Sequence, residues 1–218
     1  MKEERFALLP AFQARRDQLR AGLDRLGLQA ADDQQEQLLL FLQQMQRWNR
    51  SYNLTAVTEP GEMVARHLLD SLALGAYLRG TNFLDAGTGP GLPGVPLAIL
   101  RPDCHFVLLD GNGKKIRFLN HVRRELALAN IKPVQERLED YRPTVLPDAV
   151  LARAVAPLDR LVAWSGSLLE CGVPLLAMKG DLSESERRAV PAPYNVALVE
   201  LEIPGLRARR CLATVEKR

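Results

Sequence analysis

The chain has 218 residues, of which 47% are hydrophobic and 25% charged, which is typical of a globular protein with room for one generous domain. No apolar run approaches the ~20 residues that cross a bilayer, and the start MKEERFALLP lacks a signal-peptide core, so we expect a cytoplasmic protein without a membrane partner. The net charge of +3 is too small to indicate nucleic-acid binding by itself. The cysteines at 104, 171 and 211 are too far apart for a metal site, so we expect no metal and reduced, mostly buried thiols.

Residues 1–80 are predicted to form a helical extension that packs on the rest of the chain. Apolar residues recur at helical intervals over 34–48, and Asp32-Asp33 is placed to cap the start of that helix. A second amphipathic helix is predicted over 62–78, with Gly80 ending it. No strand alternation occurs in this part of the sequence, so its apolar faces need another surface to cover.

From Thr81 onward, short apolar runs alternate with amphipathic segments. FLDA, HFVLLD, IKPVQ, DAVLA and VPLLAM have the pattern of buried strands, whereas KIRFLNHVRREL and LDRLVAWSGSLLE have that of helices. Such alternation is typical of an α/β fold, a mostly parallel sheet covered by helices on both faces. Two last strand-like runs, 194–203 and 209–215, predict a C-terminal antiparallel hairpin around Pro204-Gly205-Leu206. We therefore place one Rossmann-like domain over residues 81–218.

Charged residues gather at the ends of the predicted strands. In open α/β sheets, ligands bind outside the carboxyl ends of the strands, close to the switch in strand order. Five charged side chains are predicted at this rim of the sheet: Asp85, Asp110, Glu139, Arg153 and Lys179. The rim is therefore where the sequence predicts a functional site.

The stretch LDAGTGPGLPGVPLAI places a glycine-rich loop between a strand and a helix. Gly87, Gly89 and Gly91 would let the backbone turn sharply and approach a ligand, although a structural tight turn is the alternative for three glycines alone. Asp110, 19 residues beyond Gly91, can accept hydrogen bonds from both hydroxyls of a ribose, which suits NAD and S-adenosylmethionine equally. Asp85 favours S-adenosylmethionine, because its carboxylate would repel a pyrophosphate and attract the ammonium and sulfonium groups.

Seven motifs occur in order along nearly the whole chain. They are RWNRSYNLTAV (47–57), RHLLDS (66–71), the glycine-rich stretch (84–99), LLDGNGKKIRFL (108–119), ERLED (136–140), ARAVAPL (152–158) and MKG (178–180). This ordered set resembles the RsmG (GidB) family of bacterial ribosomal RNA methyltransferases. The resemblance implies a class I methyltransferase fold, S-adenosylmethionine as cofactor, and transfer of its methyl group to N7 of a guanine in the decoding-region loop of 16S ribosomal RNA.

The resemblance also implies roles for residues at matching positions. Gly87 and Leu92 would contact the cofactor from the glycine-rich loop, and Leu138 and Glu139 would flank its adenine. Arg153 would lie beside the transfer site, which makes it a cofactor-binding and catalytic candidate. The loop and the strand ends add three further cofactor candidates, Asp85, Gly89 and Asp110.

The implied chemistry asks little of acid–base side chains. Guanine N7 has an in-plane lone pair and no proton to lose, so positioning and exclusion of water can carry most of the rate. This agrees with a sequence that has three histidines and no catalytic-triad pattern. Arg153 could instead form an ion pair with Glu139 or Asp85. His67 and Asp70, one helical turn apart, are expected to form a local ion pair or cap rather than a catalytic pair.

The helix after Asp110 combines an apolar face with a basic one. Leu119, Val122 and Leu126 would pack on the sheet, and the opposite stripe contains Lys114, Arg117, His121 and Arg124. Lys114, Arg117 and Arg124, together with Lys179, are our candidates for RNA binding, with an ordinary solvated face as the alternative. Trp48 and Tyr52 could stack on an extruded base or anchor the helical extension to the sheet.

Two other classes of protein stay open from the residues alone. The first is an NAD-linked oxidoreductase, although the chain leaves no room for the substrate domain that such enzymes normally have. The second is a non-catalytic nucleotide sensor or RNA-binding module. For the methyltransferase we expect 16S ribosomal RNA or the small ribosomal subunit as partner, no DNA, and a monomer.

Overall fold

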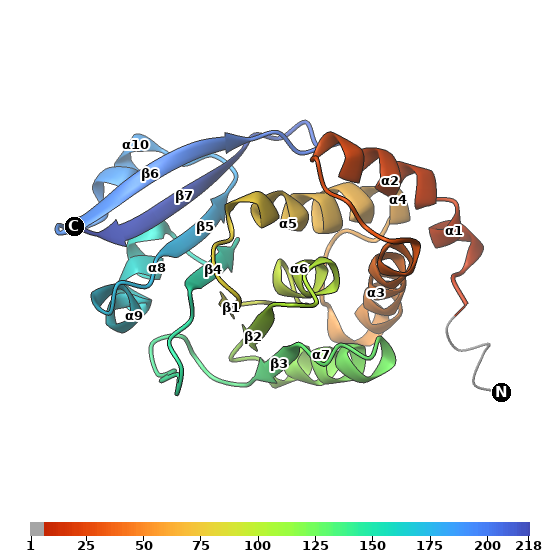
Figure 1. Cartoon of the computed structure of the whole chain (residues 1–218), viewed down its shortest axis with the longest axis horizontal. Helices are drawn as coiled ribbons and strands as arrows, with labels where there is room; N and C mark the ends of the chain where they lie inside the picture. The colour runs from red at the N-terminus through yellow and green to blue at the C-terminus, as the bar shows by residue number, and fades with distance from the viewer. Residues whose placement is uncertain (1–6) are drawn as a thin grey trace.

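The computed structural model describes residues 7–218 and has a twisted sheet at its centre (Figure 1). The strand order is β3-β2-β1-β4-β5-β7-β6. The first five strands run parallel, and β7 pairs antiparallel with both β5 and β6. The strands are β1 (Asn82–Ala86), β2 (His105–Leu109), β3 (Ile131–Val134), β4 (Ala149–Arg153), β5 (Leu175–Lys179), β6 (Tyr194–Leu201) and β7 (Arg210–Lys217). The predicted α/β sheet with a C-terminal antiparallel hairpin is therefore confirmed.

Helices cover both faces of the sheet. One face carries α6 (Gly94–Leu100) and α7 (Gly113–Glu125), and the other carries α8 (Leu158–Trp164) and α9 (Gly166–Glu170), with α10 (Glu184–Arg188) packed beside α8. Alternate residues along β1, β2, β4 and β5 enter two separate apolar clusters. Along β1, for example, Phe83 belongs to one cluster and Leu84 to the other. This burial on both faces explains why the strands are apolar without polar alternation.

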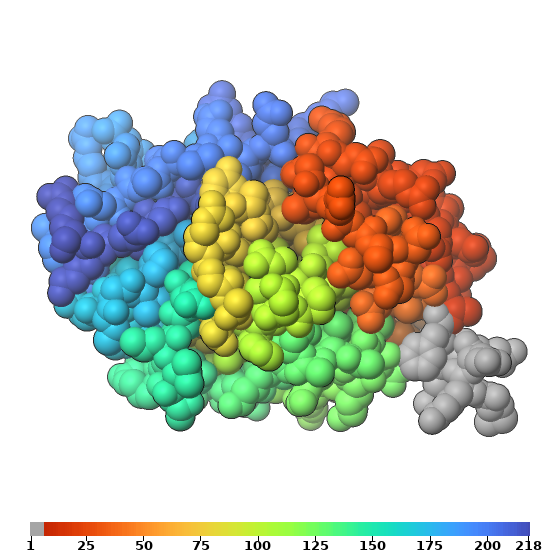
Figure 2. Space-filling view, in the orientation of Figure 1, coloured from red at the N-terminus to blue at the C-terminus, as the bar shows by residue number. Residues whose placement is uncertain are grey.

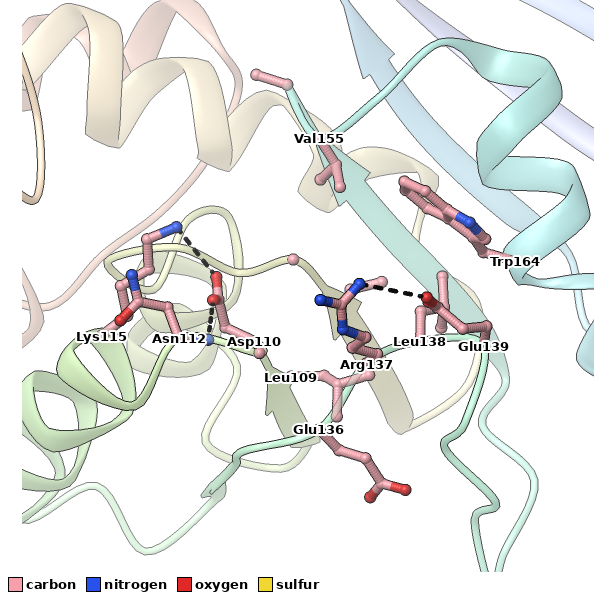
Figure 3. A pocket seen from close by; sticks show the side chains of 14 residues that line it. Leu109, Asp110, Asn112, Lys115, Glu136, Arg137, Leu138, Glu139, Val155 and Trp164 are labelled. Carbon is pink, nitrogen blue, oxygen red and sulfur yellow. Dashed lines mark hydrogen bonds and ion pairs between the residues drawn. The ribbon is translucent and has the colours of Figure 1, made fainter.

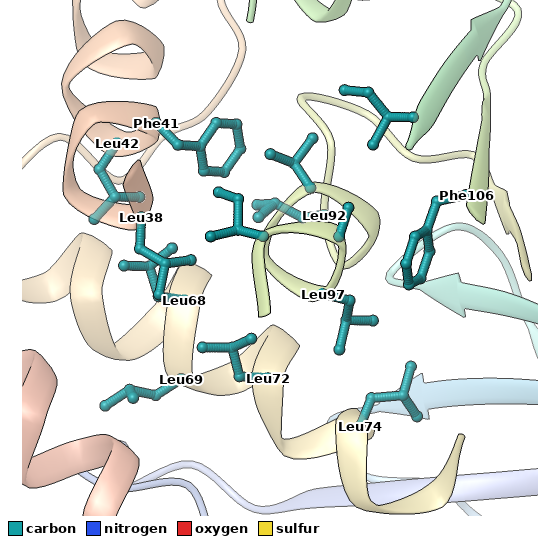
Figure 4. Packing of buried hydrophobic residues seen from close by; sticks show 14 of the residues in the cluster. Leu38, Phe41, Leu42, Leu68, Leu69, Leu72, Leu74, Leu92, Leu97 and Phe106 are labelled. Carbon is teal, nitrogen blue, oxygen red and sulfur yellow. The ribbon is translucent and has the colours of Figure 1, made fainter. Parts of the chain in front are cut away.

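The N-terminal helical region adds a layer over α6 and α7 (Figures 1 and 2). Leu38 and Phe41 of this region pack in the same apolar cluster as Leu97 and Phe106 of the sheet region (Figure 4). Since the two parts share one core, the helical region covers the sheet region rather than standing apart from it. It contains α1 (Pro10–Gln13), α2 (Arg16–Arg25), α3 (Asp32–Tyr52), α4 (Pro60–Met63), the π-helical turn η2 (Val64–Leu69), α5 (Asp70–Leu72) and the 3-10 turn η3 (Ala73–Tyr77).

Helix α3 is longer than the sequence pattern indicates, and its cap differs. Ala31 is the N-cap residue, and its backbone N–H donates to the side chain of Gln34. Asp32-Asp33 lies within the first turn, so neither residue is the N-cap, although Asp33 Oδ1 accepts a hydrogen bond from the first-turn Gln34 N at 2.9 Å. Negative charge in the first turn still favours the helix, because the exposed N–H groups give that end a partial positive charge.

The predicted helix over 62–78 contains three kinds of helical turn. Its middle, Val64–Leu69, is π-helical, and helical structure ends at Tyr77. Leu78 is already extended. Gly80, two residues later, makes the turn into β1 with a φ of +89°. A Cβ at Gly80 would lie 2.3 Å from a side-chain atom of Asp148, so this turn excludes larger residues.

Two expectations need correction, one about the C-terminal hairpin and one about the burial of the cysteines. The hairpin connection spans 202–209 and is longer than the predicted Pro204-Gly205-Leu206 turn. Of the three free cysteines, only Cys104 is buried, whereas Cys171 is exposed and Cys211 half-buried, so "mostly buried" is wrong.

Two kinds of feature are absent from residues 7–218. No helix there combines the length and apolar character of a membrane span, and no group of three or more His, Cys, Asp or Glu side chains is arranged to hold a metal ion.

Candidate functional site

A cavity of about 420 Å³ lies at the carboxyl ends of β1, β2 and β4 (Figure 3). This is the position where ligands bind in open α/β sheets, and the volume is in the range of about 300–1,000 Å³ found for small-molecule sites. Its wall comes from the segments that follow four strands. These are Ala86-Gly87 after β1, Leu109–Asn112 with Lys115 after β2, Glu136–Glu139 after β3, and Ala154-Val155 after β4, with Trp164 of α8 completing it.

Gly87 is required where the chain leaves β1. Its φ is +64°, and a Cβ there would lie 2.8 and 2.9 Å from the two γ-carbons of Val155. Both residues line the cavity, so a side chain at position 87 would collide with the opposite wall. Glycine thereby lets the backbone of the loop approach a bound molecule.

Asp85 lies beneath the glycine-rich loop rather than in the cavity wall. The side chain is fully buried, and its Oδ2 accepts hydrogen bonds from Thr88 Oγ1 at 2.6 Å and from Gly94 N at 2.8 Å. Its Oδ1 is buried without a hydrogen-bond partner in residues 7–218. Burial raises the pKa of Asp85 to about 7, so its charge near neutral pH is only partial. Asp85 therefore braces the loop, and it attracts a cation less strongly than a fully ionised carboxylate would.

Asp110 lines the cavity directly after β2. Its Oδ1 accepts a hydrogen bond from Asn112 N at 2.8 Å, and its Oδ2 accepts one from Gly89 N at 3.0 Å. Lys115 Nζ lies 3.3 Å from the same Oδ2 (Figure 3). These donors fix the carboxylate at the wall, where it can accept hydrogen bonds from a ligand. Gly89 contributes to the site through its N–H to Asp110, and it does not line the cavity itself.

The segment after β3 forms another part of the wall. Leu138 and Glu139 both line the cavity, and Glu139 lies 3.8 Å from the guanidinium of Arg137 in an exposed ion pair. Leu92, in contrast, is buried in the apolar cluster between α3 and α6 and lies outside the wall (Figure 4). The two leucines implied as cofactor contacts thus have different surroundings.

Arg153 makes its ion pair with Asp70, which the sequence analysis had placed beside His67 rather than beside Arg153. Its Nε donates to Asp70 Oδ2 at 2.8 Å, and its Nη2 donates to the carbonyl of Arg66 at 2.8 Å. The alternatives, Glu139 and Asp85, are occupied by the partners described above. Arg153 lies next to the wall residues Ala154 and Val155 without lining the cavity.

The expected local pair of His67 and Asp70 is also absent from residues 7–218. His67 Nε2 shares a hydrogen bond of 2.9 Å with Thr55 Oγ1, while Asp70 binds Arg153 and Arg210. Burial, and then the positive charge of Arg153, lower the pKa of His67 to about 4. His67 is therefore neutral at physiological pH.

Lys179 at the end of β5 is held on both sides. Its ammonium donates to the carbonyl of Ala156 at 2.6 Å and to Glu186 Oε1 at 2.7 Å, and the side chain is only 13% exposed. The same Glu186 oxygen accepts from Leu158 N at 2.7 Å. Lys179 thus ties α10 to the start of α8, and within residues 7–218 it is the one RNA-binding candidate of the four that forms an ion pair.

The basic stripe of α7 is exposed as predicted. Lys114, Arg117 and Arg124 face solvent and form no ion pair within residues 7–218, while Leu119, Val122 and Leu126 are buried. His121 differs from the rest of the stripe, because its ring lies 4.8 Å from that of Trp48, and it hydrogen-bonds Gln44.

Trp48 and Tyr52 join the helical region to α7. The ring of Trp48 lies 4.8 Å from Tyr52 and 5.7 Å from Phe118, and the guanidinium of Arg117 lies 5.9 Å from the centre of the Tyr52 ring. These contacts correspond to the anchoring interpretation of the two aromatic residues. They hold α3 against the helix that begins at the cavity.

Comparison with known proteins agrees with this geometry. A family model described as "rRNA small subunit methyltransferase G" (GidB) matches residues 34–212. The chain is 43% identical over 191 residues to a ribosomal RNA small subunit methyltransferase G of Escherichia coli O1:K1, covering 87% of this chain and 92% of that protein. A relative of the same name from Klebsiella pneumoniae is 43% identical over 195 residues, covering 89% of this chain and 94% of its own. The chain belongs to the methyltransferase G family.

Membership of the methyltransferase G family confirms the resemblance found in the seven motifs. Among solved structures, a Klebsiella pneumoniae protein assigned as an O-methyltransferase superposes with a TM-score of 0.55 at 13% identity, covering 82% of this chain and 90% of its own. At that identity the likeness concerns the fold alone. It agrees with the Rossmann-like class I methyltransferase fold expected from the sequence.

Sequence reasoning did not assign several side chains to the candidate site or to the contacts of Arg153. Lys115, Asn112 and Trp164 line the cavity, and Asp70 and Arg210 hold Arg153. Asn112 had a local signal, since Asn before a helical pattern is a preferred N-cap, and its Oδ1 accepts from Lys114 N at 2.9 Å. Asp70 and Arg210 had no such signal, because 83 and 140 residues separate Asp70 from its two partners.

Proposed function

We propose that this protein transfers a methyl group from S-adenosylmethionine to N7 of a guanine in the decoding-region loop of 16S ribosomal RNA. Family membership supports the coarser part of this proposal, methylation of RNA of the small ribosomal subunit. The observation that carries the cofactor assignment is the cavity at the strand ends, whose wall contains the Asp110 carboxylate and Gly87, where a Cβ would clash with Val155. The neighbouring helix α7 supplies unpaired positive charge for RNA.

The cavity fits the parts of S-adenosylmethionine. Asp110 would accept hydrogen bonds from the ribose hydroxyls, and the backbone at Gly87 would lie against the amino-acid portion. Leu138, Val155 and Trp164 supply apolar surface on which an adenine can pack. Glu139 beside Leu138 would accept from the adenine amino group. When bound, this cofactor supplies a methyl group on a positively charged sulfur.

The side chains around the cavity suit a reaction that needs no general base. Guanine N7 attacks with its own lone pair, so the protein has to hold the base in line and exclude water. His67 is neutral but buried against Thr55, and no proton transfer is required of it. Arg153, at the end of β4, would orient the RNA through hydrogen bonds from its planar guanidinium.

The exposed stripe of α7 would contact the RNA backbone. Lys114, Arg117 and Arg124 are the candidates, and α7 begins at the cavity wall beside Asn112. Neutralising all three with glutamine should weaken RNA binding uniformly across sequences. The salt dependence should become shallower by about 0.7 to 0.9 logarithmic units for each phosphate that the protein no longer neutralises. An unchanged salt slope would exclude the stripe from RNA binding.

The decisive experiment is methyl transfer to small subunits from cells that lack this protein. Purified enzyme and methyl-labelled S-adenosylmethionine should place label in 16S ribosomal RNA, and digestion should identify 7-methylguanosine at one position of the decoding-region loop. Label on another atom or another RNA would overturn the assignment. Cofactor binding without incorporation would favour the non-catalytic sensor, and binding of NADH without S-adenosylmethionine would favour the oxidoreductase.

A further inference from the structure

Asp70 is a buried carboxylate that two guanidinium groups share. Its side chain is 2% exposed, and its two oxygens accept from Arg153 Nε and Arg210 Nε, each at 2.8 Å. The three residues come from α5, β4 and β7, so one carboxylate joins the helical region, the parallel sheet and the hairpin. A buried carboxylate with a charge-assisted hydrogen bond to each oxygen is held firmly in one orientation.

The helix turn before Asp70 adds a second contact to Arg153. Residues Val64–Leu69 are π-helical, and the carbonyl of Arg66 in this turn accepts from Arg153 Nη2 at 2.8 Å. Single π-helical turns inside helices are rare and are frequent at functional sites. Here the wider turn presents both the Arg66 carbonyl and Asp70 to the same guanidinium. Two of the three nitrogens of that group are thereby fixed.

The third nitrogen of Arg153 is left for another partner. Its Nη1 makes none of the hydrogen bonds found within residues 7–218, although the side chain is only 16% exposed. The cluster also keeps a net positive charge, because one carboxylate faces two guanidinium groups. A fixed, partly desolvated donor with residual positive charge suits an acceptor oxygen of RNA.

We propose that Asp70 is a positioning residue, which orients Arg153 at the end of β4 so that Nη1 can donate to an acceptor oxygen of the RNA substrate. Arg210 shares the carboxylate and holds the hairpin against the same point. The inference rests on the proposed function, because it assigns Arg153 to the RNA. It adds that the placement of Arg153 depends on a carboxylate in the helical region.

The test is a double-mutant cycle on the full chain. Asp70→Asn keeps the shape of the side chain and removes its charge, and we expect kcat for RNA methylation to fall roughly 10- to 100-fold, since small misplacements of a positioning group have effects of this size. Affinity for S-adenosylmethionine should stay within about threefold. Arg153→Ala should lower kcat at least as much, and the double variant should match Arg153→Ala within about threefold, because Asp70 acts through Arg153.

Additive losses in the double variant, or full kcat in Asp70→Asn, would overturn the proposal. Asp148→Asn is the matched control. Asp148 accepts from Thr81 N and Asn82 N at the opposite end of β1, so its variant should lose stability and keep kcat. If Asp70→Asn does not fold, Asp70→Glu and Arg210→Lys apply the same test, and each should reduce kcat less than Arg153→Ala.

A separate readout distinguishes this proposal from the proposed function. In a spectrum of side-chain N–H groups, Nε–H of Arg153 should be protected from exchange in the wild type and become labile in Asp70→Asn. Absence of this change would reject the positioning role whatever the enzyme methylates. If the wild type methylates no 16S ribosomal RNA, but Asp70→Asn still makes Nε–H of Arg153 labile, the proposed function is rejected. The conclusion that Asp70 orients Arg153 then remains.

Discussion

The rim of the sheet has two halves with different chemistry. Over β1, β2 and β3, the wall of the cavity includes Asp110 and Glu139, whose oxygens are accessible to a small molecule. Over β4, β5 and β7, the charged side chains Arg153, Lys179 and Arg210 are each engaged by a carboxylate of the protein itself. Both halves lie at the carboxyl ends of the parallel strands, where Arg210 joins them as the first residue of the antiparallel β7. Asp110 and Glu139 also have basic neighbours, Lys115 and Arg137, but in contrast to the second half they line the cavity.

This difference follows from how each half is assembled. The cavity wall comes largely from segments that directly follow consecutive strands, between positions 86 and 139. In the ion-paired half, Arg153 and Arg210 depend on Asp70 from the helical region, far away in the sequence, whereas Lys179 pairs with Glu186 of the next helix, α10. A charge at a strand end can therefore contact a ligand only through the atoms that its partners inside the protein leave free, such as Nη1 of Arg153.

The largest expected effect belongs to Asp110 in the cavity half. Asp110→Ala should weaken S-adenosylmethionine binding at least 100-fold, because two charge-assisted hydrogen bonds to a ribose contribute about 3 to 6 kcal/mol together. Isothermal titration calorimetry measures this loss. Asp103→Ala, which removes an exposed carboxylate beyond α6, is the control and should bind the cofactor normally. Equal affinity in the two variants would remove Asp110 from the site.

The two leucines implied as cofactor contacts should differ in the effect of their replacement by alanine. Leu92→Ala deletes a side chain from the core and should destabilise the protein by about 2 to 5 kcal/mol, with cofactor affinity within about threefold of wild type. Leu138→Ala removes apolar surface from the cavity wall and should weaken cofactor binding about three- to tenfold. Urea unfolding and calorimetry on both variants check this. The opposite assignment of effects would place the cofactor over Leu92.

Glu186 tests the ion-paired half. Glu186→Gln leaves the ammonium of Lys179 without its charged partner and should destabilise the protein by about 1 to 3 kcal/mol, which lowers Tm by about 2 to 4 °C per kcal/mol in a chain of this size. Cofactor affinity should not change. Glu184→Gln on the same helix is the control, because its pair with Arg188 is exposed and should contribute little. A normal Tm together with weaker cofactor binding would mean that Lys179 serves the ligand.

Local patterns predicted the cavity half well. The alternation of apolar runs and helical segments indicated the sheet, and the strand ends placed Asp110 and Glu139 on its rim. The glycine-rich loop indicated that its backbone lies close to other groups. At Gly87 the space is indeed too small for a Cβ, which would clash with Val155. The prediction for Asp85 was less complete, because the position of a residue in a strand does not reveal that Thr88 and Gly94 surround its carboxylate.

The partner of Arg153 and Arg210 could not be predicted, and the reason is distance along the chain. Arg153 was placed at the correct strand end, but its partner was sought among nearby rim residues. The true partner, Asp70, faces Arg153 because a π-helical turn and the packing of the helical region bring it there. Sequence patterns of period 3.6 contain no signal for a turn of different period inside a helix.

The last prediction concerns the pH dependence of stability that two buried groups, His67 and Asp85, produce. Burial and Arg153 lower the pKa of His67 from 6.5 to about 4, so between these values the unfolded chain binds more protons. The contribution of His67 to stability is therefore complete above pH 6.5 and is lost as the pH falls through 4. Burial raises the pKa of Asp85 from 3.8 to about 7, so its contribution is complete below pH 3.8 and is lost as the pH rises through 7.

The two contributions oppose each other between pH 4 and 6.5, each changing by about 1.4 kcal/mol per pH unit. The stability of wild type minus that of His67→Gln should therefore grow by this amount per pH unit across the window. The difference between wild type and Asp85→Asn should shrink by the same amount. Urea unfolding at pH 4.5, 5.5 and 6.5 measures both. Profiles that stay parallel to wild type would mean that both groups titrate normally in the folded state. Burial would then not shift the pKa of either His67 or Asp85.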